Sequence, residues 1–241
     1  MADDRFTLRT AQMTGAQASA AQIDEGLRSY MLKVYNYMCI ALGLTGAVAY
    51  AASTSQTLMS AIYGTPLQWV VMLAPLGLVF FLSARIKSMK AQTAQMVFWI
   101  YSALVGLSIS YIFMVYTGAS ITRVFFITSA AFAGLSLYGY TTKRDLSGMH
   151  SFLIMGLIGI IIASVVNIFL ESSAMMFVIS VVGVLVFAGL TAYDTQQIKA
   201  IYREADHSET HEKKAIMGAL RLYLDFLNMF LMMLYLFGNR E

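Results

Sequence analysis

Two acidic side chains lie inside stretches of the chain that are otherwise apolar enough to enter a lipid bilayer. Asp194 lies in Val181–Lys199, and Asp225 lies in Leu220–Phe237. An ionised carboxylate inside a membrane helix costs on the order of a few kcal/mol, and such residues usually face a protein interior and serve a function. The two aspartates are therefore the first candidates for chemistry in this sequence.

Two carboxyl groups that meet in a medium of low dielectric cannot both ionise at low cost, so they share a proton and titrate as a pair. With the proton, the pair is hydrogen-bonded; without it, the pair repels itself and attracts a cation. Carboxylate oxygens are hard ligands that suit Ca²⁺. Asn228 lies one helical turn beyond Asp225 and could add a carbonyl oxygen on the same face. The hypothesis is a pH-sensing, Ca²⁺-binding pair made of Asp194 and Asp225, with Asn228 as an auxiliary ligand.

A purely structural role for the aspartates is the alternative. Arg221 lies four residues before Asp225, on the same helix face, and could simply neutralise it. Asp194 could pair with Lys199 or with a basic residue in the loop after the second span. The sequence leaves these alternatives open.

The composition is that of a polytopic membrane protein. The chain has 241 residues, of which 59% are hydrophobic and only 12% charged, and its mean hydropathy is +0.67. Soluble domains usually carry about 25% charged residues. The net charge of +3 is too small to suggest nucleic acid as a partner, and the lipid bilayer is the expected surroundings. A single cysteine, Cys39, excludes an internal disulfide and a cysteine-based metal site.

Seven stretches are long and apolar enough to cross the bilayer, which takes roughly 20 residues of helix. We therefore predict an all-α fold with one seven-helix membrane domain over residues 30–241. The seventh stretch is the least lipid-like and is expected inside the bundle. Small residues four apart, as in Ala130/Gly134 and Ala188/Ala192, are typical of close helix contacts. The predicted spans are Tyr30–Ala52, Leu67–Ala84, Thr93–Tyr116, Ile121–Thr141, Met149–Leu170, Ala174–Lys199 and Lys214–Phe237.

The segment before the first span, Met1–Ser29, is polar and has no apolar core. It is therefore not expected to be a cleavable signal peptide. We expect a loosely ordered or interfacial cytoplasmic segment there.

Basic residues alternate between the loops. They occur before the first span and after the second, fourth and sixth, whereas the first and fifth loops have none and the third has only Arg123 at its edge. By the positive-inside rule, this pattern predicts a cytoplasmic N-terminus and, after seven spans, a C-terminus outside.

This orientation puts both aspartates in the cytoplasmic half of the membrane. Asp194 lies five residues before Lys199, which corresponds to a depth of roughly 7–8 Å. Asp225 lies roughly 6 to 16 Å deep, depending on whether the interface is drawn at Arg221 or at Lys214. The sixth and seventh spans are joined by a short charged loop. The carboxyl groups could therefore meet, although the sequence does not require it.

Two motifs carry a resemblance to a known family. GLTAYDTQQIK (Gly189–Lys199) resembles the signature of the Bax inhibitor-1 family, and LYLDFLNMF (Leu222–Phe230) resembles that family's last helix. The resemblance covers essentially everything after Tyr30. It implies a bundle in which the seventh helix is central, wrapped by the other six, and a pH-dependent Ca²⁺ leak across the membrane. It also implies that Asp194 and Asp225 are the pH-sensing pair.

The family further implies an arginine latch at the end of the second span. Arg85 is the nearest match, and Arg221 has a competing claim to the same role. Some bacterial relatives carry a glutamate about three turns before that arginine, whereas Leu73–Leu76 here has no acid. The compact length and uninterrupted spans are typical of a bacterial inner-membrane protein.

Two other functions compete with the leak channel. Intramembrane aspartyl proteases also carry a Tyr-Asp pair, as in Tyr193–Asp194. Here, however, Leu222–Asp225 lacks their glycines and no proline motif follows, so no enzyme is expected. A non-transporting regulator that binds other membrane proteins or proteases is the second alternative. His207 and His211 could form a weak metal site, but a solvated polar loop is favoured. Beyond protons and Ca²⁺, no cofactor or metal is predicted.

Overall fold

A computed structural model describes the backbone of residues 3–240 and the side chains of residues 25–240. Within that range extended pairing is limited to an isolated bridge between Tyr116 and Arg240, and almost all else is helical. The predicted all-α class is confirmed. The elements are α1 (Asp3–Ser53), α2 (Gln56–Tyr63), α3 (Leu67–Arg85), α4 (Ala91–Ile109), α5 (Ile112–Val115), α6 (Gly118–Thr141), η1 (Ser147–Met149), α7 (His150–Leu170), α8 (Ser173–Ala200) and α9 (Ser208–Phe237).

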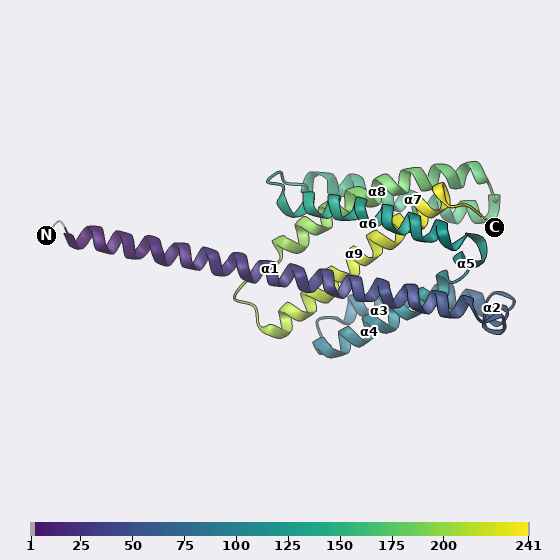
Figure 1. The fold of residues 1–241 in the computed structure, drawn as a ribbon, viewed down its shortest axis with the longest axis horizontal. Coiled ribbons are helices and arrows are strands. Elements are labelled where there is room, and N and C mark those ends of the chain that lie inside the picture. The colour runs from purple at the N-terminus through teal and green to yellow at the C-terminus, as the bar shows by residue number, and fades with distance from the viewer. Residues whose placement is uncertain (1–2, 241) are drawn as a thin grey trace.

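Seven of these segments are long and apolar enough to cross a membrane, and they coincide with the seven predicted spans. The third span continues from α4 into the short helix α5. In the structure, α1 is already helical from Asp3, well before the first predicted span (Figure 1). The physical reason is that this segment contains no proline and many good helix formers, so nothing ends the helix before the apolar part begins.

The spans form two groups of three with α9 between them (Figure 1). In one group α4 packs against α1 and α3; in the other α8 packs against α6 and α7. Helix α9 packs against α8, α1, α6 and α4. The predicted central position of the seventh span is confirmed, but its main neighbours are four helices rather than six. Helices α3 and α7 lie on the outside and pack chiefly on α4 and α8.

Burial explains how α9 tolerates its polar residues. Half of its most apolar stretch is buried, compared with 17% for α3 and 11% for α7. Consecutive residues such as Leu222 and Tyr223, or Asp225, Phe226 and Leu227, are all buried, so protein surrounds the helix on every side. Its polar side chains therefore face other helices instead of lipid.

The closest approach between α6 and α8 occurs at Gly139. A Cβ atom at this position would overlap the carbonyl oxygen of Ala192 on α8. Ala192 belongs to one of the predicted small-residue pairs and does lie at a helix contact. Gly134 does not, because a Cβ atom there would meet open space. Gly139 thus fixes the distance between α6 and the part of α8 that carries Asp194.

The loop between α8 and α9 is closed by a charged contact. Lys214, in the second turn of α9, donates hydrogen bonds to the Asp206 carboxylate and to the Ile201 carbonyl oxygen. Among the described residues no group of three metal-binding side chains occurs, so the histidine metal site finds no support. His211 instead packs against the ring of Tyr202, with 5.3 Å between ring centroids.

The Asp206 contact predicts an acid-sensitive loop. The hydrogen bond from Lys214 holds the pKa of Asp206 below its usual value. Its stabilisation is therefore complete above about pH 4, the pKa of an unfolded aspartate, and is lost as the pH falls through the lower folded pKa. Amide hydrogen exchange of residues 201–207 should be faster in Asp206→Asn than in the wild type at pH 6, and the difference should shrink below pH 4. Equal exchange at pH 6 would contradict this.

Candidate functional site

The two aspartates lie on facing helices, Asp194 on α8 and Asp225 on α9. Both side chains line the same cavity, and each carboxyl is close enough to affect the other electrostatically. Asp225 is the more deeply buried, with only 4% of the residue exposed, whereas 16% of the Asp194 side chain is exposed. The sequence placed the two groups at overlapping depth, and the packing of α8 against α9 brings them together.

One oxygen of this pair lacks a partner. Oδ2 of Asp225 is buried and accepts no hydrogen bond from any residue whose side chain the structure describes. A buried polar atom without a partner is costly, and native proteins rarely keep one without a reason. A carboxylate oxygen of this kind is chemically able to take up a proton or to coordinate a cation.

Arg221 provides the nearby positive charge. Its Nη1 lies 3.9 Å from Oδ1 of Asp194, and 54% of its side chain is exposed. The arginine therefore reaches across to α8, although helical spacing pointed to Asp225 on its own helix. At this distance and exposure the ion pair is weak. It offsets part of the negative charge of the two aspartates but does not hold their side chains in one position.

Lys199, the other basic residue near Asp194 in sequence, is engaged elsewhere. Its Nζ donates to the carbonyl oxygen of Tyr140 at 2.8 Å and lies 5.0 Å from the centre of the Tyr140 ring. Arg85 is exposed at the end of α3 and forms no salt bridge among the described side chains. Of the two candidate latch arginines, the fold brings Arg221 to the aspartates and leaves Arg85 away from them.

The aspartates open into a cavity of about 910 Å³ between α7, α8 and α9, with Leu76 of α3 at its edge. Asn228 also lines it; its Nδ2 donates to the Leu224 carbonyl oxygen at 2.8 Å, which leaves its Oδ1 out of that bond. The remaining lining is largely apolar. The polar residues of the lining are His150, Ser164, Tyr193, Asp194, Gln197, Arg221, Asp225 and Asn228.

The sequence interpretation missed His150. This histidine begins α7, lines the cavity, and packs against Tyr193 with 5.0 Å between ring centroids. Its ring therefore contacts the residue that directly precedes Asp194 on α8. Its only sequence signal was a lone histidine at the start of the fifth span.

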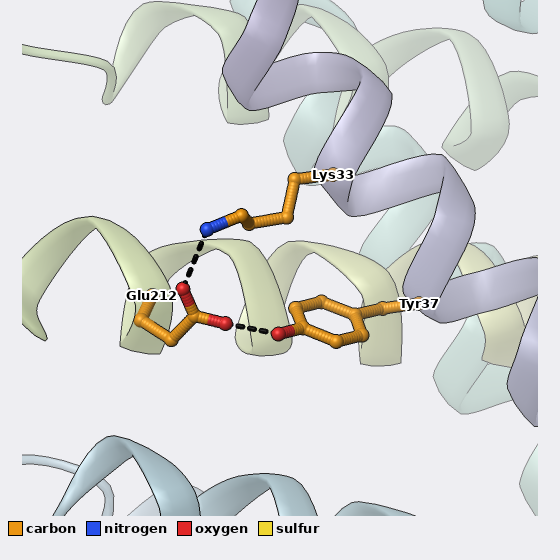
Figure 2. Close-up of polar contacts among 3 residues, drawn as sticks. All are labelled: Lys33, Tyr37 and Glu212. Atoms are coloured by element: carbon orange, nitrogen blue, oxygen red, sulfur yellow. Dashed lines mark hydrogen bonds and ion pairs between the residues drawn. The ribbon is translucent and has the colours of Figure 1, made fainter. Parts of the chain in front are cut away.

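A second polar cluster, also missed, joins α1 to the first turns of α9 (Figure 2). Lys33 Nζ lies 2.6 Å from Oε2 of Glu212, and the Tyr37 hydroxyl donates to Oε1 of the same carboxylate. Both oxygens of Glu212 are therefore satisfied. The cluster fixes the beginning of α9 against α1, nine residues before Arg221.

Comparison with known proteins gives consistent matches over nearly the whole chain. The family model described as inhibitor of apoptosis-promoting Bax1 matches residues 27–241. Inner membrane protein YbhL of Escherichia coli (strain K12) is 48% identical over 226 residues, which cover 92% of this chain and 97% of YbhL. A protein of Rickettsia prowazekii is 50% identical over 218 residues, covering 90% and 92% of the two chains. A protein of Caulobacter vibrioides is 43% identical over 247 aligned positions, covering 98% and 99%.

Proposed function

The chain belongs to the Bax inhibitor-1 family of membrane proteins, and from this premise we propose that it is a pH-sensitive cation leak channel that conducts Ca²⁺. The proposal rests on one observation above all. A deeply buried carboxyl, Asp225, has an unpartnered oxygen beside a second carboxyl, Asp194, at the wall of a membrane cavity. A purely structural ion pair would leave no such oxygen unsatisfied.

The mechanism follows from the charge that the Asp194–Asp225 pair carries with and without its shared proton. When Asp194 and Asp225 share one proton, the pair carries one negative charge, which Arg221 balances. Loss of that proton adds a second negative charge in a site of low dielectric, where like charges repel strongly. The added charge favours separation of α8 from α9 or uptake of a cation by the carboxylates. Protons and Ca²⁺ thus compete for the same oxygens, with Asn228 as an additional oxygen ligand.

The proposal also includes an orientation of the chain in the membrane. The basic loops that follow the second, fourth and sixth spans lie in the cytoplasm, together with the N-terminus, and the C-terminus lies outside. The relative YbhL is named an inner membrane protein, which supports the same membrane for this chain. The aspartate pair then faces the pH of the cytoplasm.

Purified protein in liposomes loaded with a Ca²⁺ indicator tests the proposal directly. We expect Ca²⁺ influx above that of protein-free liposomes, with a rate that differs between pH 6 and pH 8. Absence of flux at both pH values would contradict the channel and favour a regulator that binds other membrane proteins without transporting ions.

A matched pair of arginine variants tests the assignment of the latch. Arg221→Gln removes the charge that lies 3.9 Å from Asp194, so it should shift the pH at which flux changes. Arg85→Gln removes a charge that lies outside the cavity and should leave the pH profile unchanged. Both are measured in the same liposome assay across pH 6 to 8. If Arg85→Gln shifted the pH profile and Arg221→Gln did not, Arg85 would be the latch residue.

A further inference from the structure

A second and larger cavity, of about 1,090 Å³, lies on another face of the bundle. Helix α1 forms one wall, α6 forms the other, and Phe226, Leu227 and Phe230 of α9 contribute to the floor. It shares no lining residue with the cavity that contains the aspartates. We call it the α1–α6 groove.

The groove is long enough to span the hydrocarbon core of a bilayer. On α1 its lining extends from Arg28 to Ala49, which at the rise of an α-helix corresponds to roughly 31 Å. This is close to the thickness of the hydrocarbon core of a bilayer, about 30 Å. The groove therefore extends along the direction in which the acyl chains of lipids lie.

The interior of the groove is suited to an apolar occupant. The Tyr35 hydroxyl and Ser136 Oγ form a hydrogen bond of 2.6 Å, and Thr45 Oγ1 donates to the Ser102 carbonyl oxygen at 2.9 Å. These hydroxyls are thus already satisfied within the protein, and most of the remaining lining is hydrocarbon. Apolar cavities hold water poorly, whereas an acyl chain fills them without loss of hydrogen bonds.

One end of the groove is positively charged and the other is not. Helices α1 and α6 run in opposite directions (Figure 1) and are joined by the Tyr35–Ser136 hydrogen bond, so Arg28 of α1 and Tyr140 of α6 lie at the same end. Among the residues that line the groove, Arg28 is the one that carries a charge. The opposite end is lined by apolar residues such as Ile109 and Phe113.

We propose that the α1–α6 groove binds a phospholipid with an anionic headgroup. An acyl chain, which spans one leaflet of the bilayer, occupies roughly the half of the groove nearest its basic end, and the headgroup phosphate meets Arg28 there. Basic pockets between membrane helices recognise anionic lipid headgroups in this way, and arginine pairs well with phosphate. A groove without charge at its end would take any lipid, so the charge at one end is what selects the headgroup.

Retention of lipid by the full chain, measured by native mass spectrometry, tests this. Phosphatidylglycerol and phosphatidylcholine with the same acyl chains serve as probes. The wild type should retain phosphatidylglycerol in preference. Arg28→Gln should lower that preference about fivefold, the effect of losing about 1 kcal/mol for one basic residue at the membrane surface. Equal retention of the two lipids by the wild type would overturn the proposal.

Two glycines offer a matched test of the groove itself. A Cβ atom at Gly43 or at Gly159 would meet open space, so a side chain can be introduced at either position without overlap at its Cβ. Gly43 lines the groove, whereas Gly159 on α7 lines neither cavity. Gly43→Phe should reduce retention of both lipids, and Gly159→Phe should not. If Gly43→Phe instead leaves lipid retention unchanged but alters the oligomeric state, the groove is a protein interface and the lipid proposal is wrong.

Discussion

Replacement of Asp225 by asparagine should remove the pH dependence of Ca²⁺ flux. Asparagine keeps the size of the side chain and can donate a hydrogen bond to Asp194, so the contact between α8 and α9 is retained. It cannot lose a proton, however, and the second negative charge never appears. Between pH 6 and pH 8 the flux of the wild type should change severalfold, and that of Asp225→Asn by no more than about twofold.

The control for this experiment changes a carboxylate outside the cavity. Asp206→Asn alters the α8–α9 loop but leaves the aspartate pair untouched, so its flux should follow the wild-type pH profile. Thermal unfolding in detergent shows whether each variant is folded. If folded Asp225→Asn keeps the wild-type profile, the shared-proton mechanism is wrong even where Ca²⁺ flux itself is present.

A methyl group at Gly139 should destabilise the protein by about 1–3 kcal/mol, the usual range for overpacking a well-packed core. The new Cβ would overlap the backbone of Ala192, which cannot rotate away as a flexible side chain can. The two helices must therefore move apart. Because Asp194 lies two residues beyond Ala192, Gly139→Ala should also disturb the contact between the two carboxyls.

Gly134→Ala on the same helix provides the matched comparison. Its Cβ would meet open space, so the change removes only the conformational freedom of a glycine and should stabilise the helix by up to about 1 kcal/mol. Denaturant titration in mixed micelles measures both variants. Opposite signs are expected at the two positions, and equal effects would show that α6 and α8 do not approach closely at Gly139.

The spans were predictable because their signal is local. A run of about 20 apolar residues is sufficient to indicate a membrane helix, whatever it packs against. The two aspartates stood out for the same reason, since each interrupts such a run. The central position of α9 also followed from its own polar residues, Arg221, Asp225 and Asn228, which require protein surroundings.

The partners of the aspartates were less predictable because they depend on how the helices rotate against each other. The spacing rule for one helix paired Arg221 with Asp225, whereas the packing of α8 on α9 directs it to Asp194. Lys199 is close to Asp194 in sequence yet contacts Tyr140 on α6. The position of Arg85 depends on α3, which packs mainly on α4 and contributes Leu76, but not Arg85, to the lining of the cavity.

The place of α9 in the chain has a consequence for biosynthesis. The helix around which the others pack is the last of the seven spans to leave the ribosome. Until it is made, the α1–α3–α4 group and the α6–α7–α8 group lack their common centre. Lys33, in the first span, contacts Glu212, which lies 179 residues later in the chain. The aspartate site, and the packing of the two groups around a common centre, therefore require the helix that translation supplies last.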